Sequence, residues 1–113
     1  MRALLLLPLL IACQQSDTDG YRMLCDSVEL CDTCRGKGQL EATESHIEWV
    51  RANVTNESAL GFAETLQIAS SASSGELLRA AARSAGVTDC KFAEHLDDPD
   101  GMHREWGTTD ASP

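Results

Sequence analysis

The chain has 113 residues, enough for one small domain, and carries 18 acidic against 9 basic residues for a net charge of −9. Phosphate groups are bound through clustered cations, so this balance argues against nucleic acid and against anionic lipid as partners. Only 4 % of the residues are aromatic, which predicts a core built mainly from aliphatic side chains, as in packed helices.

The first residues have the pattern of an export signal. Met1 and Arg2 give a positive start, and residues 3–12 are apolar. At about 1.5 Å per residue this run spans about half of the hydrocarbon core of a bilayer, so it is too short for a transmembrane helix. It fits the apolar region of a signal peptide, which we expect to comprise residues 1–12.

The segment Leu10-Ile11-Ala12-Cys13 resembles the lipobox of bacterial lipoproteins. The resemblance implies cleavage before Cys13 and attachment of diacylglycerol to its sulfur, so the only expected cofactor is this covalent lipid. Several acyl chains anchor a protein stably to a membrane. The expected location is the cell envelope. Gln14 after the lipidated cysteine is typical of outer-membrane lipoproteins in Gram-negative bacteria, facing the periplasm or the cell surface.

Residues 13–20 are expected to be the lipidated cysteine and a flexible tether, because residues 14–20 contain no apolar side chain. A helical domain is predicted over residues 21–97. Its first helix is indicated by apolar side chains that recur on one helical face. They are Tyr21, Leu24, Cys25, Val28 and Cys31.

Three or four more helices are predicted downstream. The second covers residues 39–54, and its predicted inward stripe is Leu40, Thr43, Ile47, Val50 and Val54. The third covers residues 57–69 with Asn56 or Thr55 as its cap. The fourth begins after Ser73, stops at Gly86 and is predicted to turn Leu77, Leu78, Ala81 and Ala85 inward. A short last helix starts at Thr88.

The segment of residues 97–101, Asp-Asp-Pro-Asp-Gly, is interpreted as a helix breaker, so residues 98–113 are predicted to form a disordered tail. No period-two strand pattern is present. The sequence therefore predicts an all-α fold, a small bundle of four to five short helices stapled by disulfides.

Four cysteines remain after Cys13, and three pairings of them are open. An even number in a small exported domain favours two disulfides. We prefer Cys25–Cys90, which ties the two ends of the domain together, and Cys31–Cys34, which are near neighbours. Closing the longer loop is expected to contribute about 4 kcal/mol.

Two functional alternatives use the Cys31 and Cys34 pair. The C-x-x-C spacing is that of thiol–disulfide oxidoreductases, although here it follows a helix instead of opening one. Residues 31–38 also fit C-x-x-C-x-G-x-G and resemble the zinc-binding repeat of a family of heat-shock chaperones. That resemblance implies a metal site at these two cysteines, completed by Cys25 and Cys90 or by histidines.

The histidines His46, His95 and His103 are isolated in the sequence, and His46 and His95 are expected to be solvated. The segment of residues 79–90 resembles small helical, cysteine-containing envelope lipoproteins of Gram-negative bacteria that have no assigned activity. No catalytic motif is present. The leading hypothesis is therefore a non-enzymatic, membrane-anchored interaction module that binds an envelope protein or a cell-wall component. The alternative is a metal-binding or thiol-redox protein that uses Cys31 and Cys34.

Overall fold

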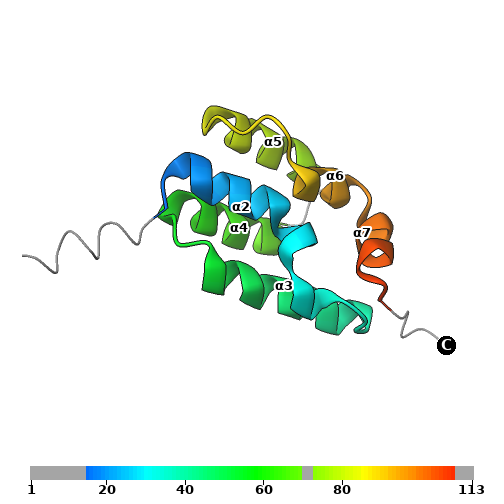
Figure 1. Ribbon diagram of the computed structural model, residues 1–113. Helices are drawn as coiled ribbons and strands as arrows, with labels where there is room; N and C mark the ends of the chain where they lie inside the picture. The colour runs from blue at the N-terminus through cyan, green and yellow to red at the C-terminus, as the bar shows by residue number, and fades with distance from the viewer. Residues whose placement is uncertain (1–14, 70–72, 109–113) are drawn as a thin grey trace, which may run out of the picture.

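The computed structural model describes residues 15–69 and 73–108, and every regular element in that part of the chain is helical (Figure 1). In chain order the elements are α2 (Asp17–Leu30), the 3₁₀ turn η1 (Asp32–Cys34), α3 (Gln39–Asn53), α4 (Glu57–Ala69), α5 (Ser74–Ser84), α6 (Lys91–Asp97) and α7 (Pro99–Trp106). The predicted all-α class is confirmed. No helix in these residues is long and apolar enough to span a bilayer.

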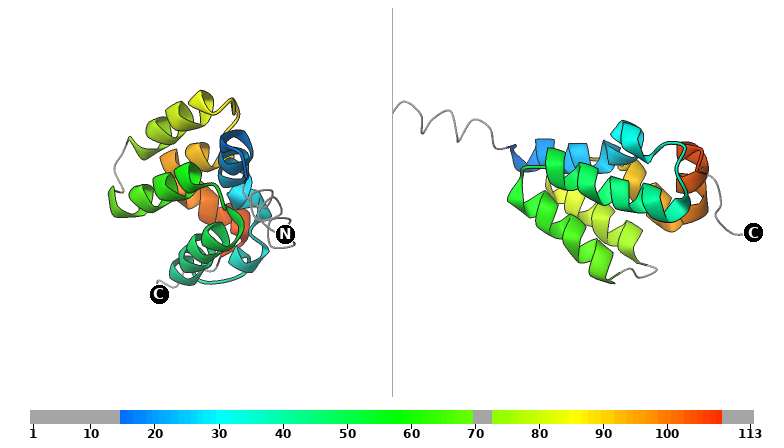
Figure 2. Two further views of the ribbon diagram at one scale, coloured as in Figure 1. Left: turned by 90° about the vertical axis from the view of Figure 1, so that its left-hand side faces the viewer. Right: turned by 90° about the horizontal axis from the view of Figure 1, so that it is seen from below.

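Helix α2 is the central element of the bundle and contacts α3, α4, α5 and α6 (Figures 1 and 2). Its inward face is the predicted one, because side chains three and four residues apart share one side of a helix. The buried members of that face are Tyr21, Leu24, Cys25 and Val28, with Cys31 directly after the helix. The remaining helices are arranged around this apolar stripe.

The start of α2 corrects the predicted tether of residues 13–20. Ser16 caps the helix, since its hydroxyl accepts a hydrogen bond from the Asp19 amide at 3.1 Å, and Asp17 lies in the first turn. Gln15 is hydrogen-bonded to the turn between α3 and α4. The polar residues that suggested a tether are helix-capping residues, and the tether prediction is wrong from Gln15 onward. Residues 13 and 14 lie outside the described residues.

Helix α3 has the predicted range, and Val50 and Val54 are buried as predicted, but some other members of the predicted inward stripe are exposed. Leu40, predicted to be buried, is 74 % exposed, and Thr43 is also exposed. The buried side chains are Ala42, Ser45, His46 and Val50. Small and polar side chains take the inward face because His46 packs against aromatic rings from α6 and α7 and has a hydrogen-bond partner on α2.

Helices α4 and α5 agree with the predictions in most respects. Asn56 caps α4, accepting a hydrogen bond from the Ala59 amide at 2.9 Å. Gly86 stops the α5 segment with a φ of +88°, a left-handed conformation that favours glycine. Leu77 is the exception on α5, since it was predicted to face inward and is 53 % exposed.

Helix α7 corrects the predicted disordered tail of residues 98–113. Asp98 caps it, accepting a hydrogen bond from the Gly101 amide at 3.2 Å, and Pro99 occupies its first turn. Trp106 at its end is 2 % exposed and donates its indole N–H to the Val28 carbonyl at 2.7 Å. The residues interpreted as a breaker therefore begin a helix that completes the core. Residues 109–113 lie outside the described residues.

Candidate functional site

The four described cysteines form two disulfides in the pairing preferred from the sequence. Cys25 on α2 is joined to Cys90, which precedes α6, with 4.5 Å between their Cα atoms. Cys31 and Cys34 are joined across η1, with 5.5 Å between their Cα atoms. The first bridge ties together positions 65 residues apart, and the second closes a short local loop.

The Cys31–Cys34 pair has few features of a redox or metal centre. It follows the C-terminal end of α2, where the helix dipole disfavours a thiolate, and both side chains are fully buried. Within residues 15–69 and 73–108 no group of three or more histidine, cysteine or carboxylate side chains is arranged to hold a metal ion. The glycine-containing loop after it is used in packing, because the Gly36 amide donates to the Trp106 carbonyl at 3.0 Å.

The three histidines lie in three different environments. His95 on α6 is mostly buried, and its Nε2 atom contacts a carboxylate oxygen of Glu105 on α7, which corrects the expectation of a solvated side chain. His103 packs its ring against that of Trp106, and its buried Nδ1 atom has no hydrogen-bond partner among the described residues. His46 is 6 % exposed, so the expectation of a solvated residue is wrong for it as well.

His46 forms a Ser–His pair that sequence reasoning missed. Its Nε2 atom lies 2.7 Å from Ser27 Oγ, and that hydroxyl donates to the Leu24 carbonyl, so the imidazole is the donor in the pair. Burial lowers the pKa of His46 to about 4. The pair superficially matches a nucleophile and its base, but Ser27 is fully buried and no substrate reaches it. Ser27 and His46 are 19 residues apart, so no local sequence motif predicts that they form a pair.

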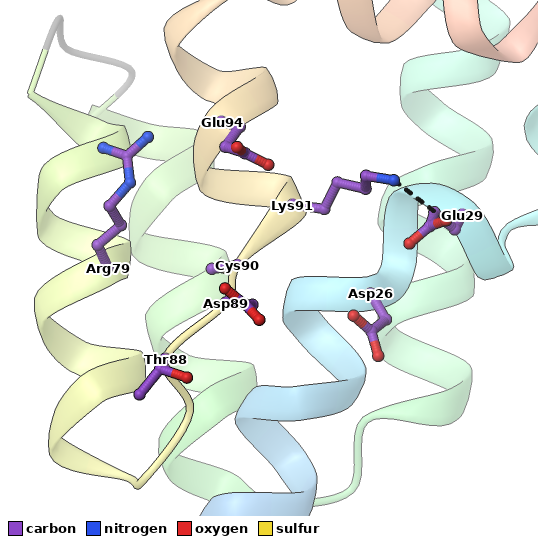
Figure 3. Close-up of a pocket in the computed structure, with 8 residues that line it drawn as sticks. All are labelled: Asp26, Glu29, Arg79, Thr88, Asp89, Cys90, Lys91 and Glu94. Carbon is purple, nitrogen blue, oxygen red and sulfur yellow. Dashed lines mark ion pairs between the residues drawn. The ribbon is translucent and has the colours of Figure 1, made fainter.

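An open groove of about 330 Å³ lies between α2, α5 and α6 on the described surface (Figure 3). Cys90 lies on its wall, so the Cys25–Cys90 bridge joins α2 to the start of α6, two of the three helices that form the groove. Its lining residues are Asp26, Glu29, Arg79, Thr88, Asp89, Cys90, Lys91 and Glu94. A second hollow of about 240 Å³ shares three of them and extends the groove along the loop after α5.

The groove presents mainly negative charge, because its two cations are each paired with a carboxylate. Lys91 is paired with Glu29 at 3.3 Å, which raises the pKa of Lys91 (Figure 3). Arg79 is paired with Asp97 at 2.6 Å, which raises the pKa of Arg79. Among the described ion pairs none involves Asp26 or Asp89. The groove can therefore receive a cationic side chain, but it presents no nucleophile with a neighbouring base.

Cys13, the expected lipidation site, lies outside the described residues. No protein-family model matches the chain, and searches of curated proteins and of solved structures find no match.

Proposed function

We propose that this chain is an exported lipoprotein, anchored to a membrane of the cell envelope through lipid on Cys13, whose helical domain binds an envelope partner without catalysing a reaction. The proposed location in the cell envelope is inferred from the lipobox-like segment that ends at Cys13. The interaction role is supported by a mixed-charge groove and by a Ser27–His46 pair that is closed to substrates.

The observation that carries the proposal is the pair of disulfides inside the core. Disulfides of this kind form and persist in oxidising compartments and are rare in the cytosol. Cys25, Cys31 and Cys34 are fully buried, so the bridges are part of the packing instead of surface additions. A small domain with a thin core gains a large share of its stability from such bridges. Export to an oxidising compartment, with a free cysteine left only at position 13, is consistent with a lipidated Cys13.

The groove suggests what the partner offers. Asp26 and Asp89 present carboxylates outside the described ion pairs, while the neighbouring cations are already paired. A lysine- or arginine-bearing protein segment fits this charge pattern. We therefore favour an envelope protein over an anionic cell-wall component as the partner.

The alternative function at Cys31 and Cys34 has less support. A redox centre needs a thiol that its substrate can reach, and a zinc site needs two further ligands. Both sulfurs are buried and bonded to each other.

Cell fractionation tests the anchoring. The full chain is expressed in a bacterial host beside a Cys13→Ser variant, which removes the sulfur that would carry the lipid. We expect the unaltered chain in the detergent-soluble membrane fraction and the variant outside it. Equal partitioning of the two proteins would contradict the proposal.

A photo-crosslinking residue tests the interaction role. It is placed at Thr88, which is exposed and lines the groove, and, as a matched control, at Thr43, which is exposed on α3. We expect a discrete cross-linked product in intact cells from position 88 that Asp26→Asn with Asp89→Asn reduces at least threefold. The same product from both positions, or none from position 88, would count against a groove partner.

A further inference from the structure

One end of the bundle, which we call the anchor end, is formed by the start of α2 and the turn between α3 and α4 (Figure 1). Gln15 joins these two segments. Its side-chain oxygen accepts from the Thr55 amide at 2.9 Å, and its side-chain nitrogen donates to the Asn53 carbonyl at 3.0 Å. Its backbone amide also donates to the Thr55 hydroxyl at 3.2 Å. Gln15 is therefore part of the folded domain.

Asn56 extends this network into α2 and α4. Its side-chain nitrogen donates to Asp17 at 2.8 Å and to the Gln15 carbonyl at 3.2 Å, while its oxygen caps α4. Gly20 allows the close approach, since a Cβ atom at that position would overlap the Asn56 side chain. The end of α5 is attached as well, because the Thr18 hydroxyl donates to the Ala85 carbonyl at 2.6 Å. At the anchor end, hydrogen bonds thus join the start of α2 to the α3–α4 turn, to the start of α4 and to the end of α5.

The distance from this assembly to the expected lipid is short. Only Gln14 stands between Cys13 and Gln15, so their Cα atoms lie at most about 7 Å apart. The headgroup layer of a bilayer is about 5 to 7 Å thick on each side. A lipid on Cys13 therefore leaves no room for a spacer between the membrane and the domain.

From this geometry we propose that the anchor end is a bilayer-facing surface that rests on lipid headgroups; this rests on the proposed lipidation of Cys13. The bundle then stands with α7 and η1, which lie at its other end, away from the membrane (Figure 1). The groove of Figure 3 lies along the side of the bundle and stays open to a partner.

The charges at the anchor end select the lipid it fits. A hollow of about 260 Å³ at this end is lined by Gln15, Asp17, Thr55, Asn56 and Glu57. Its charged groups are the two carboxylates, and Asp19 adds a third exposed carboxylate in the first turn of α2. Arg51, exposed in the last turn of α3, is a cation near this end, so the carboxylates outnumber it. Carboxylates are repelled by the negative potential of anionic headgroups and attracted by ammonium groups. The surface therefore fits phosphatidylethanolamine better than phosphatidylglycerol.

Paramagnetic broadening of amide signals tests the orientation. The natively processed, isotope-labelled protein is placed in phosphatidylethanolamine-rich nanodiscs that carry a gadolinium chelate on some headgroups. We expect at least a threefold loss of signal for amides of residues 16–20 and 55–57, and no loss for residues 36–39 and 103–108. The control carries twelve glycine and serine residues inserted between Gln14 and Gln15, which should abolish the loss.

Lipid composition tests the charge argument. Replacing half of the phosphatidylethanolamine by phosphatidylglycerol should reduce the broadening at the anchor end at least twofold. Asp19→Asn with Glu57→Gln removes two of the three carboxylates, leaves the Asp17–Asn56 hydrogen bond in place, and should reduce that sensitivity.

The outcomes separate the two proposals. An acylated protein with uniform broadening, or with broadening at residues 103–108, would overturn the orientation and leave the lipid anchor standing. A mature protein without acyl groups would overturn both. Broadening that is indifferent to phosphatidylglycerol would overturn the headgroup preference alone.

Discussion

The two ends of this bundle are held together by different means. At the anchor end, amide and hydroxyl side chains such as Gln15, Thr18 and Asn56 hydrogen-bond across three connections. At the distal end, which we define by η1 and α7, a disulfide and the aromatic rings of Trp106 and His46 make the contacts. Hydrogen bonds near water contribute about 1 kcal/mol each, whereas buried aromatic rings and bridges contribute several. The contacts that stabilise the fold most are therefore those of the distal end. The hydrogen bonds of the anchor end add less stability, but they fix how the domain is oriented relative to Cys13.

The largest effect is expected from the Cys25–Cys90 bridge between α2 and the start of α6. Cys25→Ala with Cys90→Ala opens a loop of 65 residues and should lower the free energy of unfolding by about 4 kcal/mol. The matched control, Cys31→Ala with Cys34→Ala, removes a bridge between residues only 3 positions apart. It should lower the free energy of unfolding by about 2 kcal/mol. Urea denaturation of both variants measures the difference. A larger loss from the local bridge would contradict the account.

Removing the buried indole should loosen the distal end. Trp106→Ala deletes a side chain that is 2 % exposed and should lower the free energy of unfolding by about 3 to 4 kcal/mol. Trp106→Phe keeps a ring but loses the hydrogen bond to the Val28 carbonyl, so it should cost about 2 kcal/mol. Thermal unfolding followed by circular dichroism measures both. If Trp106→Ala is as stable as the unaltered protein, α7 does not contribute to the core.

Acid should also weaken the distal end through His46. The fold lowers the pKa of His46 to about 4, while the unfolded chain takes up the proton near its ordinary pKa of 6.5. This contribution to stability is therefore complete above pH 6.5 and is lost as the pH falls toward 4, by about 3 kcal/mol.

The variant His46→Gln isolates this proton, because glutamine can still donate to Ser27 but does not titrate. Between pH 7 and 5, where most carboxylates stay ionised, the unaltered protein should lose about 2 kcal/mol more than the variant. Parallel stability curves for the two proteins would show that His46 is not buried as a neutral ring.

The smallest effect is expected at the anchor end. Gln15→Ala removes the side-chain hydrogen bonds to Asn53 and Thr55 and should cost about 1 kcal/mol, because these groups can bond to water instead. The amides of residues 53–56 should exchange with deuterium faster, while those of α7 should not change. Equal protection in both proteins would show that Gln15 does not hold this end.

Much of the fold follows from local patterns that the sequence displays. The face of α2, the bounds of α4 with its Asn56 cap, and the stop at Gly86 all rest on helical spacing or on one residue's backbone preference. The disulfide pairing also followed from the position of Cys25 on the inward face of α2. These features depend on few contacts between distant segments.

The errors arise where tertiary contacts decide. His46 is buried because Ser27, Phe92 and Trp106 surround it, and none of these is its neighbour in the sequence. The same rings make α7 part of the core, while Asp98 and Pro99 suit a loop and a helix start equally well. Gln15 belongs to the domain only because of a turn 40 residues away. The charged groove likewise exists only once α2, α5 and α6 meet.

The most direct measurement is the intact mass of the mature protein, purified from membranes without reductant. We predict a chain that begins at position 13, carries the mass of its acyl groups on that cysteine, and lacks the four hydrogens that two disulfides remove. A protein that still begins with Met1, bears no acyl mass and has four titratable thiols at positions 25, 31, 34 and 90 would contradict the lipid anchor and the oxidising compartment together.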